Sequence, residues 1–558
     1  MKVAVALSIS LAFLCGVGHA APTLAGPTAN IRNGTYVGIQ NTHYNQDYFL
    51  GIPYAQQPVG NLRFTIPQSL ASTWEGTRDA KEYSDICVGY GTDSIWYPQG
   101  EACLTLNVIR DSSVEAGSNL PVGVWIHGGG FVMGSGADQR YNMSAIVANA
   151  HRIGKPFIGV TINYRLSAWG FLGSREITET GNTNLGLRDQ RLALQWIQEN
   201  IAAFGGDPSK VTIFGESAGA MSVGFHLTAY GGRDDGLFRA AIMQSGGSVM
   251  ASSMNTTAYQ GMYDEIVGKV GCDTAQDTLQ CLREVSFKRL NAVFNGTDGN
   301  PAYNFSPAVD HDLVKEWGSD QLNKQEFVQV PIIAGTNTDE GASFGPTGIN
   351  TTEQFYSYLT NGGSGFKLPP PIAREILDLY PDDPLQGIPA FLGSQRIPSK
   401  GYQWRRTSAY AGDYSMHANR RRQCEVWAEA DLPVYCYRFN MRSGNIDYLS
   451  GAAHFEEVAF VFNNIVGLGY HYGLPFEGMP ESYTRLSTLM ASMWASFIHE
   501  LDPNSGIDAD IYWENYGRNQ PVDVVFDANV TALGYMEDDT WRKEGIDFIN
   551  SVAKAFWR

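Results

Sequence analysis

The sequence predicts a single large α/β domain, residues 21–558, in which helices cover both faces of a mostly parallel sheet. The first observation behind this prediction is that short apolar strands alternate with helical segments along the chain. The second is that no low-complexity linker, long charge run or internal repeat divides the 558 residues. Strands that alternate with helices are typical of parallel sheets, because parallel neighbours need long crossover connections.

The individual elements follow from the spacing of apolar residues. We expect strands at residues 122–126, 157–163, 211–214, 239–244, 330–335 and 434–439. Apolar residues at helical spacing predict a helix over residues 185–202. In such a sheet functional sites form at the carboxyl ends of the strands, so we look for chemistry in the segments that follow them.

Residues 1–20 have the pattern of a secretory signal peptide. Lys2 precedes an apolar run, residues 3–17, that is too short to span a membrane. Gly18 and Ala20 are small residues at the cleavage positions, so we expect the mature chain to begin near Ala21. No second apolar stretch approaches the length of a membrane span, and the last residues do not resemble a lipid-anchor tail. We therefore expect a secreted, extracellular protein without a stable membrane anchor.

Cysteines and sequons agree with that compartment. Removing Cys15 with the signal leaves six cysteines, and an even number in a secreted chain suggests disulfides. Their spacing suggests three small loops, 87–103, 272–281 and 424–436, although spacing alone does not determine the pairing. The glycosylation candidates are Asn33, Asn142, Asn255, Asn295, Asn304, Asn350 and Asn529.

Charge and motif content exclude several function classes. The chain has 39 Lys and Arg against 57 Asp and Glu, a formal net charge of −18. This charge disfavours nucleic acid and anionic membranes as partners. Neither a C-x-x-C nor an H-E-x-x-H pattern occurs in the sequence, so we predict no metal and no cofactor.

A G-x-S-x-G pentapeptide at residues 215–219 predicts a nucleophile, Ser217. A short β-branched and aromatic strand, residues 210–214, precedes it, and an apolar stretch at helical spacing, residues 218–227, follows it. Strand, sharp turn and helix make a nucleophile elbow, in which the flanking glycines leave room for a strained serine. The turn also points the amino terminus of the helix at developing negative charge.

A second match to the same pattern, residues 341–345, serves as a control. Pro346 follows it closely, so a helix cannot begin after Ser343 as one begins after Ser217. We therefore interpret Ser343 as part of a loop.

A glycine-rich segment, residues 127–131, closes the predicted strand 122–126. Its sequence, H-G-G-G-F, suits a cradle of backbone N–H groups for an oxyanion. An activated nucleophile and an oxyanion cradle are the two demanding parts of acyl transfer. Together the two motifs predict ester hydrolysis, provided that the chain also supplies a base and an acid.

The base should be a histidine that follows Ser217 in the chain. Among ten histidines, His454 follows a predicted strand and a polar loop, which suits a catalytic base. His417 lies beside three arginines and is interpreted as a surface helix residue. His471 and His499 are interpreted as ordinary surface or packing positions.

The acid should lie between nucleophile and base, again after a strand. The predicted strand 330–335 leads directly to Asp339 and Glu340. Either carboxylate could orient an imidazole, either could be a solvated loop residue, and the pattern does not choose between them.

These ordered motifs resemble the type-B carboxylesterase/lipase family, which includes cholinesterases and yeast-type secreted lipases. The resemblance covers nearly all of the mature chain and implies the α/β-hydrolase fold. The matching segments are residues 49–55, 58–64, 101–108, 127–131, 163–166, 204–208, 215–219, 244–246, 339–341 and the loop that carries His454.

The resemblance implies a role for each site residue. The family's acid is the Glu of its D-E-G motif, which falls on Glu340, and its base falls on His454. The implied oxyanion donors are the backbone N–H groups of Gly129, Gly130 and Ala218. Ser245 resembles a serine beside the family's acid, and we place Glu216, next to the nucleophile, in the same surroundings.

The resemblance also implies cross-links. It pairs Cys87 with Cys103 and Cys272 with Cys281, whereas a Cys424–Cys436 pair has no clear counterpart and stays open. It further suggests structural ion pairs of Arg63 with Glu101 and of Arg165 with Asp189.

We therefore expect a secreted serine hydrolase that cleaves small-molecule or lipid esters through an acyl-enzyme, most closely a carboxylesterase with an open site. The 87–103 loop is short beside the lid or gorge wall of the family's lipases and cholinesterases, which favours an esterase. A true lipase on long-chain acylglycerols is the alternative, and Tyr90, Trp96 and Tyr97 either line the site or merely pack the loop. A non-catalytic adhesion protein is disfavoured, because such relatives typically lack the nucleophile. The oligomeric state stays open.

Overall fold

The computed structural model describes residues 26–249, 255–363 and 365–558, so the predicted signal peptide lies outside the described residues. The described strands build an eleven-stranded sheet in the order β16-β15-β14-β13-β12-β11-β9-β10-β8-β4-β3. These strands are β3 (Ile39–Asn41), β4 (Gln46–Pro53), β8 (Thr105–Asp111), β9 (Leu120–Ile126), β10 (Ile158–Ile162), β11 (Gly206–Glu216), β12 (Ala240–Gln244), β13 (Ile332–Asn337), β14 (Val434–Phe439), β15 (Val522–Phe526) and β16 (Gly534–Asp538).

The centre of this sheet is parallel and its two edges are antiparallel. Neighbouring strands pair in parallel from β10 across to β15. At one edge β16 pairs antiparallel with β15, and at the other edge β8, β4 and β3 each pair antiparallel with the strand before them in the sheet. The register brings the strand ends together, since Glu216 pairs with Gln244 and Gln244 pairs with Gly335. The predicted α/β class with a mostly parallel sheet is thereby confirmed.

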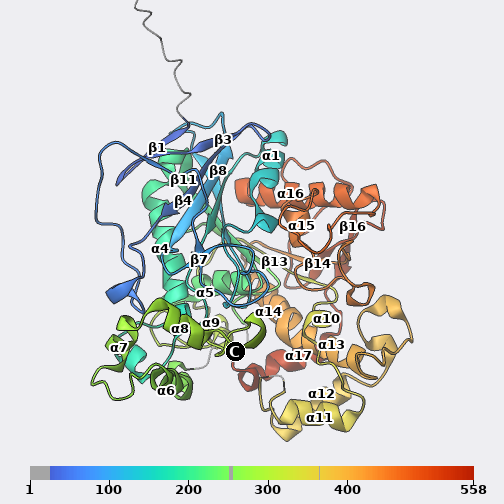
Figure 1. Ribbon diagram of the computed structural model, residues 1–558. Helices are drawn as coiled ribbons and strands as arrows, with labels where there is room; N and C mark the ends of the chain where they lie inside the picture. The colour runs from blue at the N-terminus through green and yellow to red at the C-terminus, as the bar shows by residue number, and fades with distance from the viewer. Residues whose placement is uncertain (1–25, 250–254, 364) are drawn as a thin grey trace, which may run out of the picture.

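Helices cover both faces of the sheet (Figure 1). On one face, Val124 and Ile213 belong to the same apolar core as α4 (Leu185–Asn200) and α5 (Ala218–Gly232). On the other face, the alternate residues Trp125 and Phe214 pack in a second core. That core includes residues of α1 (Ser144–Arg152) and α16 (Glu481–Glu500). Both sides of each central strand are buried, which explains why these strands are apolar throughout.

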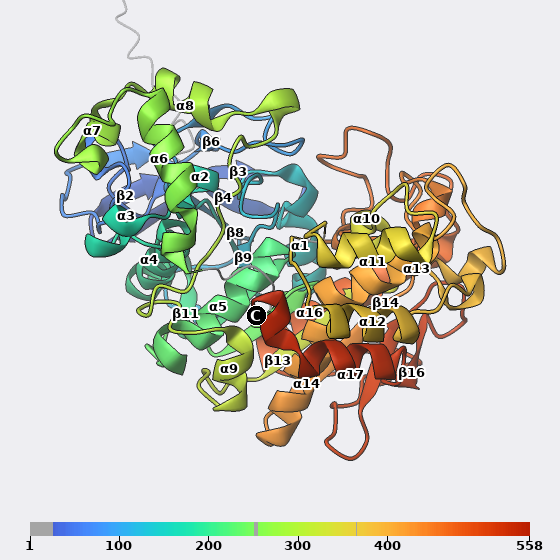
Figure 2. The ribbon, with the colours of Figure 1, turned by 90° about the horizontal axis from the view of Figure 1, so that it is seen from below.

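Two groups of helices leave the sheet after neighbouring strands. Between β12 and β13 lie α6 (Gln260–Lys269), α7 (Thr278–Glu284), α8 (Phe287–Phe294) and α9 (Gly318–Asn323). Between β13 and β14 lie α10 (Gly341–Phe344), α11 (Thr352–Thr360), α12 (Pro370–Leu379), α13 (Trp404–Gly412) and α14 (Ala418–Glu429). Figures 1 and 2 place α6, α7 and α8 on one side of the molecule and α11, α12 and α13 on the other.

The remaining helices are short or lie near the end of the chain. They are α2 (Ser167–Phe171), α3 (Arg175–Glu179), α15 (Val458–Val461) and α17 (Lys543–Ser551). Residues of α11, α12, α13 and α17 share a third apolar core. None of the helices in the described part of the chain combines the length and apolar character that crossing a membrane requires.

The predicted elements match the observed ones better in position than in length. The bounds of β14 are those expected, whereas β11 begins well before residue 211 and β13 begins at Ile332 instead of residue 330. The predicted helix over residues 185–202 changes at Ile201 into a 3₁₀ turn. Sheet pairing and caps decide where an element ends, and these depend on partners that are distant in the sequence.

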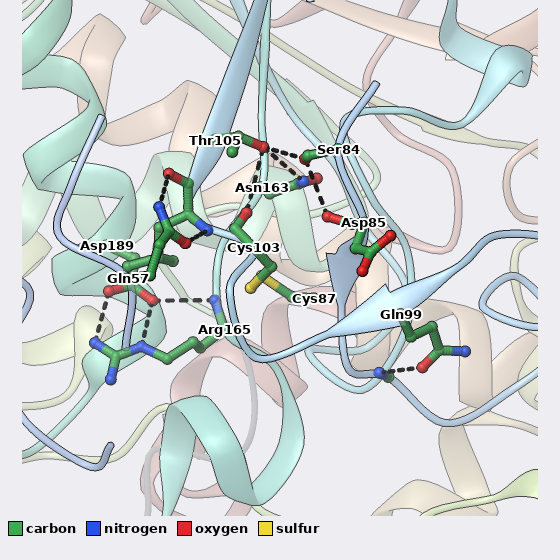
Figure 3. Close-up of a disulfide and its surroundings, with 12 residues drawn as sticks. Gln57, Ser84, Asp85, Cys87, Gln99, Cys103, Thr105, Asn163, Arg165 and Asp189 are labelled. Carbon is green, nitrogen blue, oxygen red and sulfur yellow. Dashed lines mark hydrogen bonds and ion pairs between the residues drawn. A yellow bond between two sulfur atoms is a disulfide. The ribbon is translucent and has the colours of Figure 1, made fainter. Parts of the chain in front are cut away.

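All three cysteine pairs form disulfides, including Cys424–Cys436, which the sequence left open. The expected ion pairs are also present: Arg63 Nη2 donates to Glu101 Oε2 at 2.8 Å, and Arg165 Nη2 to Asp189 Oδ1 at 2.7 Å. Figure 3 shows the Cys87–Cys103 disulfide together with the Arg165–Asp189 pair.

The sequons differ in exposure. Asn33 is buried, and its side-chain nitrogen donates to the carbonyl oxygens of Leu70 and Ser72, so a glycan on this nitrogen would disrupt both hydrogen bonds. Asn142 is half-buried and its amide donates to Gln139. The exposed candidates are Asn255, Asn295, Asn304, Asn350 and Asn529.

Candidate active site

Ser217 stands at the sharp turn between β11 and α5, as the nucleophile elbow requires. Its backbone has φ 55° and ψ −123°, a left-handed conformation that costs free energy in any residue other than glycine. Its N–H donates to the carbonyl of Gln244 at 2.9 Å, and its own carbonyl accepts from Met221. A Cβ on Gly219 would lie 2.0 Å from the carbonyl oxygen of Ile126, so only glycine lets α5 begin so close to β9.

The glycine-rich segment after β9 packs directly against this turn. A Cβ on Gly128 would lie 2.5 Å from the carbonyl oxygen of Glu216 and 3.1 Å from Cβ of Ser217. Gly129 and Gly130 have φ of 93° and 63°, which glycine adopts freely. No hydrogen bond among the described residues uses the N–H of Gly129 or Gly130 as its donor. Both amides are thus available to an oxyanion.

A third amide adjoins these two. Ala218 is the first residue of α5, and the N–H groups of a helix's first turn have no partner within the helix. The positive end of the helix dipole adds to its attraction for an anion. The glycine-rich segment that contains Gly129 and Gly130 therefore packs, through Gly128, against the turn that leads into Ala218, the third predicted donor.

His127, the first residue of the glycine-rich segment, is held in place by Tyr164. Its ring is buried and stacks on Tyr164 at 4.3 Å between centroids, and Tyr164 Oη donates to the His127 carbonyl at 2.8 Å. Burial lowers the pKa of His127 to about 4, so the ring is neutral at ordinary pH.

Glu340 and His454 form a hydrogen-bonded pair, in which Glu340 is buried and the side chain of His454 is 14% exposed. Nδ1 of His454 lies 2.7 Å from Oε2 of Glu340. The other carboxylate oxygen of Glu340 accepts from the Asn337 N–H at 2.8 Å and from the hydroxyl of Ser245, which is buried beside it. The ambiguity between the two acids is resolved, since Glu340 and not Asp339 contacts the imidazole.

Asp339 instead holds the backbone of the loop that carries His454. Its Oδ2 accepts from the Ala452 N–H at 2.9 Å, and its own N–H donates to the Ala452 carbonyl at 2.9 Å. Asn337 Nδ2 donates to the Ala453 carbonyl at 2.6 Å. Residues at the carboxyl end of β13 therefore hold the backbone of the two residues before His454, while Glu340 orients the His454 ring. Burial raises the pKa of Asp339 to about 6.

Two further carboxyl groups, Glu216 and Glu457, lie near this pair. Nε2 of His454 lies 3.1 Å from Oε1 of Glu216, which brings the ring to the residue before Ser217. Glu457 is buried and accepts from Asn337 Nδ2 at 2.7 Å and Gln244 Nε2 at 3.2 Å. The sequence analysis missed Glu457, although a Glu pair directly after His454 and before an apolar helix is a signal that could have found it.

These buried groups compete for protons. Burial raises the pKa of Glu457 and raises that of Glu216 well above its usual value. Burial alone would lower the pKa of His454, but the carboxylates of Glu216 and Glu340 outweigh it and raise that pKa to about 9. The imidazole of His454 and the carboxyl of Glu216, 3.1 Å apart, therefore influence each other's protonation.

Two of the sequence interpretations were wrong at this site. Ser343 lies in the short helix α10 and not in a loop. The helix begins at Gly341, before Ser343, and Gly345 caps its end. The last residue of α10, Phe344, packs edge-on against His454, with 4.8 Å between ring centroids. The second pentapeptide is thus part of the site.

His417 is buried, and not a surface residue. Its Nδ1 lies 3.0 Å from Thr336 Oγ1 on β13. Burial and the nearby arginines hold its pKa well below the usual value. Of the three arginines that suggested a surface, Arg420 and Arg421 are buried and both bond Asp539, whereas Arg422 is half-buried.

Comparisons with known proteins identify the family of this chain. The sequence model of the carboxylesterase family matches residues 25–539. The chain is 36% identical to Lipase 5 of Diutina rugosa over 589 aligned residues, which cover 100% of both chains. It is 32% identical to Secreted lipase 1 of Botryotinia fuckeliana (strain B05.10), over 96% of this chain and 94% of that one. The crystal structure of Aspergillus niger EstA superposes with a TM-score of 0.82 at 28% identity and covers 96% and 99% of the two chains.

Proposed function

We propose that Ser217, His454 and Glu340 are the catalytic triad of this chain, which belongs to the carboxylesterase family and is a carboxylic ester hydrolase. The observation that carries the proposal is the Glu340–His454 pair, because Nδ1 of His454 bonds Glu340 and its Nε2 lies 3.1 Å from Oε1 of Glu216, the residue before Ser217. Ser217, His454 and Glu340 follow β11, β14 and β13 in the chain. The carboxyl ends of these parallel strands lie on the same side of the sheet.

The proposed reaction has two halves. His454 takes the hydroxyl proton while Oγ of Ser217 attacks the ester carbonyl carbon, and the imidazolium then gives that proton to the departing alcohol. In the second half His454 removes a proton from water, the resulting hydroxide attacks the acyl-enzyme, and the proton returns to Ser217 as the acid leaves. Glu340 holds the ring in one tautomer and stabilises its cation throughout.

The oxyanion is proposed to bind to the N–H groups of Gly129, Gly130 and Ala218. Support comes from the two positive φ values, which turn consecutive amides to one side, and from the start of α5 at Ala218. Losing one such donor typically costs about 2.7–4 kcal/mol in the transition state. Because the glycine-rich segment touches the elbow itself, we expect these donors to need little rearrangement during the reaction.

For the substrate we propose carboxylic esters of short to medium acyl chain at an open site. The short 87–103 loop supports this choice, and it contacts the body of the protein through Trp96, which stacks on His471 at 3.9 Å between centroids. Its aromatics divide in role: Tyr90 is buried and packs the loop, whereas Trp96 is 43% exposed. A long-chain lipase is the second candidate, because the relatives named above are lipases.

Two experiments test the proposal. An organophosphonate probe should label the protein covalently, and the label should be lost in Ser217→Ala. Rates over p-nitrophenyl esters from acetyl to palmitoyl should peak at the shorter chains. A sharp rise above the solubility limit of a long-chain ester would identify a lipase instead.

We further propose that the protein is secreted and carries glycans on some of its exposed sequons, and that residues 1–20 direct this export. The three disulfides and the similarity to a secreted lipase support extracellular location. Mass spectrometry of the secreted protein, before and after glycosidase treatment, would test both points.

A further inference from the structure

Arg140 lies where two functional segments meet, the 87–103 loop and the loop that carries His454. It belongs to a 3₁₀ turn, Gln139–Tyr141, that follows the glycine-rich segment in the chain. Its guanidinium holds Asp138 with Nε and Nη2, at 3.0 and 2.7 Å from Oδ2. The same Nη2 lies 2.7 Å from Oδ2 of Asp93, a residue of the 87–103 loop.

This ion cluster is more enclosed than an ordinary surface pair. The side chains of Arg140, Asp138 and Asp93 are 16%, 3% and 21% exposed. Exposed ion pairs contribute little, because water screens them and their long side chains lose entropy. Here two carboxylates bind one planar guanidinium at the same time, so the orientation of the guanidinium plane is fixed.

That face is turned to Phe455, the residue after His454. The guanidinium carbon lies 4.8 Å from the centroid of the Phe455 ring, a distance suited to a cation–π contact. Phe455 has φ 77°, a left-handed conformation that is rare for a residue with a large side chain. Backbone strain of this kind persists only where the surroundings hold it in place.

We propose that Arg140 is a positioning residue: it holds the left-handed turn at Phe455 and so places the imidazole of His454, and it connects this turn to the 87–103 loop through Asp93. The proposal rests on the role of His454 in the proposed function. Asp339 and Asn337 hold the residues before His454, and Arg140 holds the residue after it. The base is thereby fixed from both sides in the chain.

The first test removes the charge and the planar fork but keeps the stem, in Arg140→Met. We expect kcat per organophosphonate-titrated site to fall about tenfold with KM changed less than about twofold, because a small displacement of a catalytic group is costly. Arg175→Met is the control, since Arg175 is an exposed arginine paired with Glu176 on the surface. It should leave kcat and KM unchanged.

The second test uses Phe455→Gly, because glycine adopts a left-handed φ without strain and has no ring for Arg140 to contact. If Arg140 acts through Phe455, adding Arg140→Met to Phe455→Gly should change kcat by less than about twofold. A merely structural arginine would instead give effects that multiply. Asp93→Asn, which loosens only the tie to the 87–103 loop, should lower kcat about threefold.

The outcomes separate this inference from the proposed function. An unchanged kcat per titrated site in Arg140→Met, or effects that multiply in the double variant, would overturn the role of Arg140 alone. Fewer titrated sites with a normal kcat would overturn it too, because that result means lost folding and not a displaced base. If Arg140→Met gives no folded protein, an unchanged kcat in Asp93→Asn overturns the connection to the loop. Activity retained by Ser217→Ala would instead contradict the triad itself.

Discussion

The two G-x-S-x-G segments of this protein share a sequence pattern but adopt different backbone conformations. Residues 215–219 turn from β11 into the long helix α5, and Ser217 takes φ 55°. Residues 341–344 follow β13 after a short turn and form the single-turn helix α10, which ends at Phe344, two residues before Pro346. A pattern of glycines permits an elbow, but the flanking strand and a continuing helix are what produce one.

Both segments nevertheless reach the same imidazole. The first presents Glu216 to Nε2 of His454 at 3.1 Å, and the second presents the Phe344 ring to its face at 4.8 Å between centroids. The glycines are also required in both, but by different neighbours. Gly219 lies against the backbone of Ile126, whereas Gly345 lies against Ser408 of α13.

The largest expected difference is between the two serines. Ser217→Ala should lower kcat by at least about 10⁴-fold, because the acyl-enzyme cannot form. Ser343→Ala should leave kcat within about twofold of the parent enzyme. Hydrolysis of p-nitrophenyl butyrate by the two purified variants measures this directly, and comparable losses in both would contradict the assignment of the nucleophile.

The next largest difference is between the two neighbouring acids. Glu340→Gln should cost about 10³–10⁴-fold in kcat, because an amide can neither fix the productive tautomer nor stabilise the imidazolium. Asp339→Asn keeps an oxygen for the Ala452 N–H, so we expect a loss within about fivefold. Steady-state kinetics at one pH would settle the order, and a larger effect in Asp339→Asn would reverse our assignment.

The last glycines of the two segments should differ in their effect on stability. A methyl at Gly219 would meet a backbone oxygen at 2.0 Å. At Gly345 the nearest atom is the Ser408 hydroxyl at 2.3 Å, which can rotate away, and the backbone atoms next to it are farther, at 2.8 and 2.9 Å. We expect about 3 kcal/mol of destabilisation in Gly219→Ala and about 1–2 kcal/mol in Gly345→Ala. Thermal unfolding midpoints of both variants provide the measurement, with equal shifts as the contrary result.

The second position of the first segment should control the pH profile. The base must be unprotonated, and the carboxylates of Glu216 and Glu340 raise the pKa of His454 to about 9, so kcat/KM should rise with pH towards that value. Glu216→Gln removes one carboxyl charge and should move this acidic limb to lower pH. An acidic limb that stays in place would mean that Glu216 holds a proton throughout and does not charge the site.

The smallest expected effect belongs to the fourth position of the second segment. Phe344→Leu loses an edge-on aromatic contact with His454, which is worth about 0.5–1.5 kcal/mol, or a roughly two- to tenfold loss in kcat/KM. Phe391→Leu is the matched control, because Phe391 is exposed and packs on Tyr448 instead. Equal losses in the two variants would show that Phe344 does not act through the imidazole.

What the sequence determined by itself lies in short segments. The elbow around Ser217 and the glycine-rich segment after β9 are each encoded by a few consecutive residues, so their pattern alone predicted where the turn and the glycine-rich segment lie. The six cysteines predicted three cross-links, although the Cys424–Cys436 pairing needed the structure. Alternation of apolar strands and helices likewise predicted the sheet, because that alternation reflects burial on both faces.

What only the tertiary structure decided lies between segments far apart in the chain. Glu340 and His454 are 114 positions apart, and whether Glu340 or Asp339 meets the imidazole depends on how two loops pack. The same is true of the buried His417, of Glu457 bonded to Asn337 and Gln244, and of Arg140 against Phe455. A side chain's burial and charge depend on neighbours that folding supplies, and a one-dimensional pattern does not contain them.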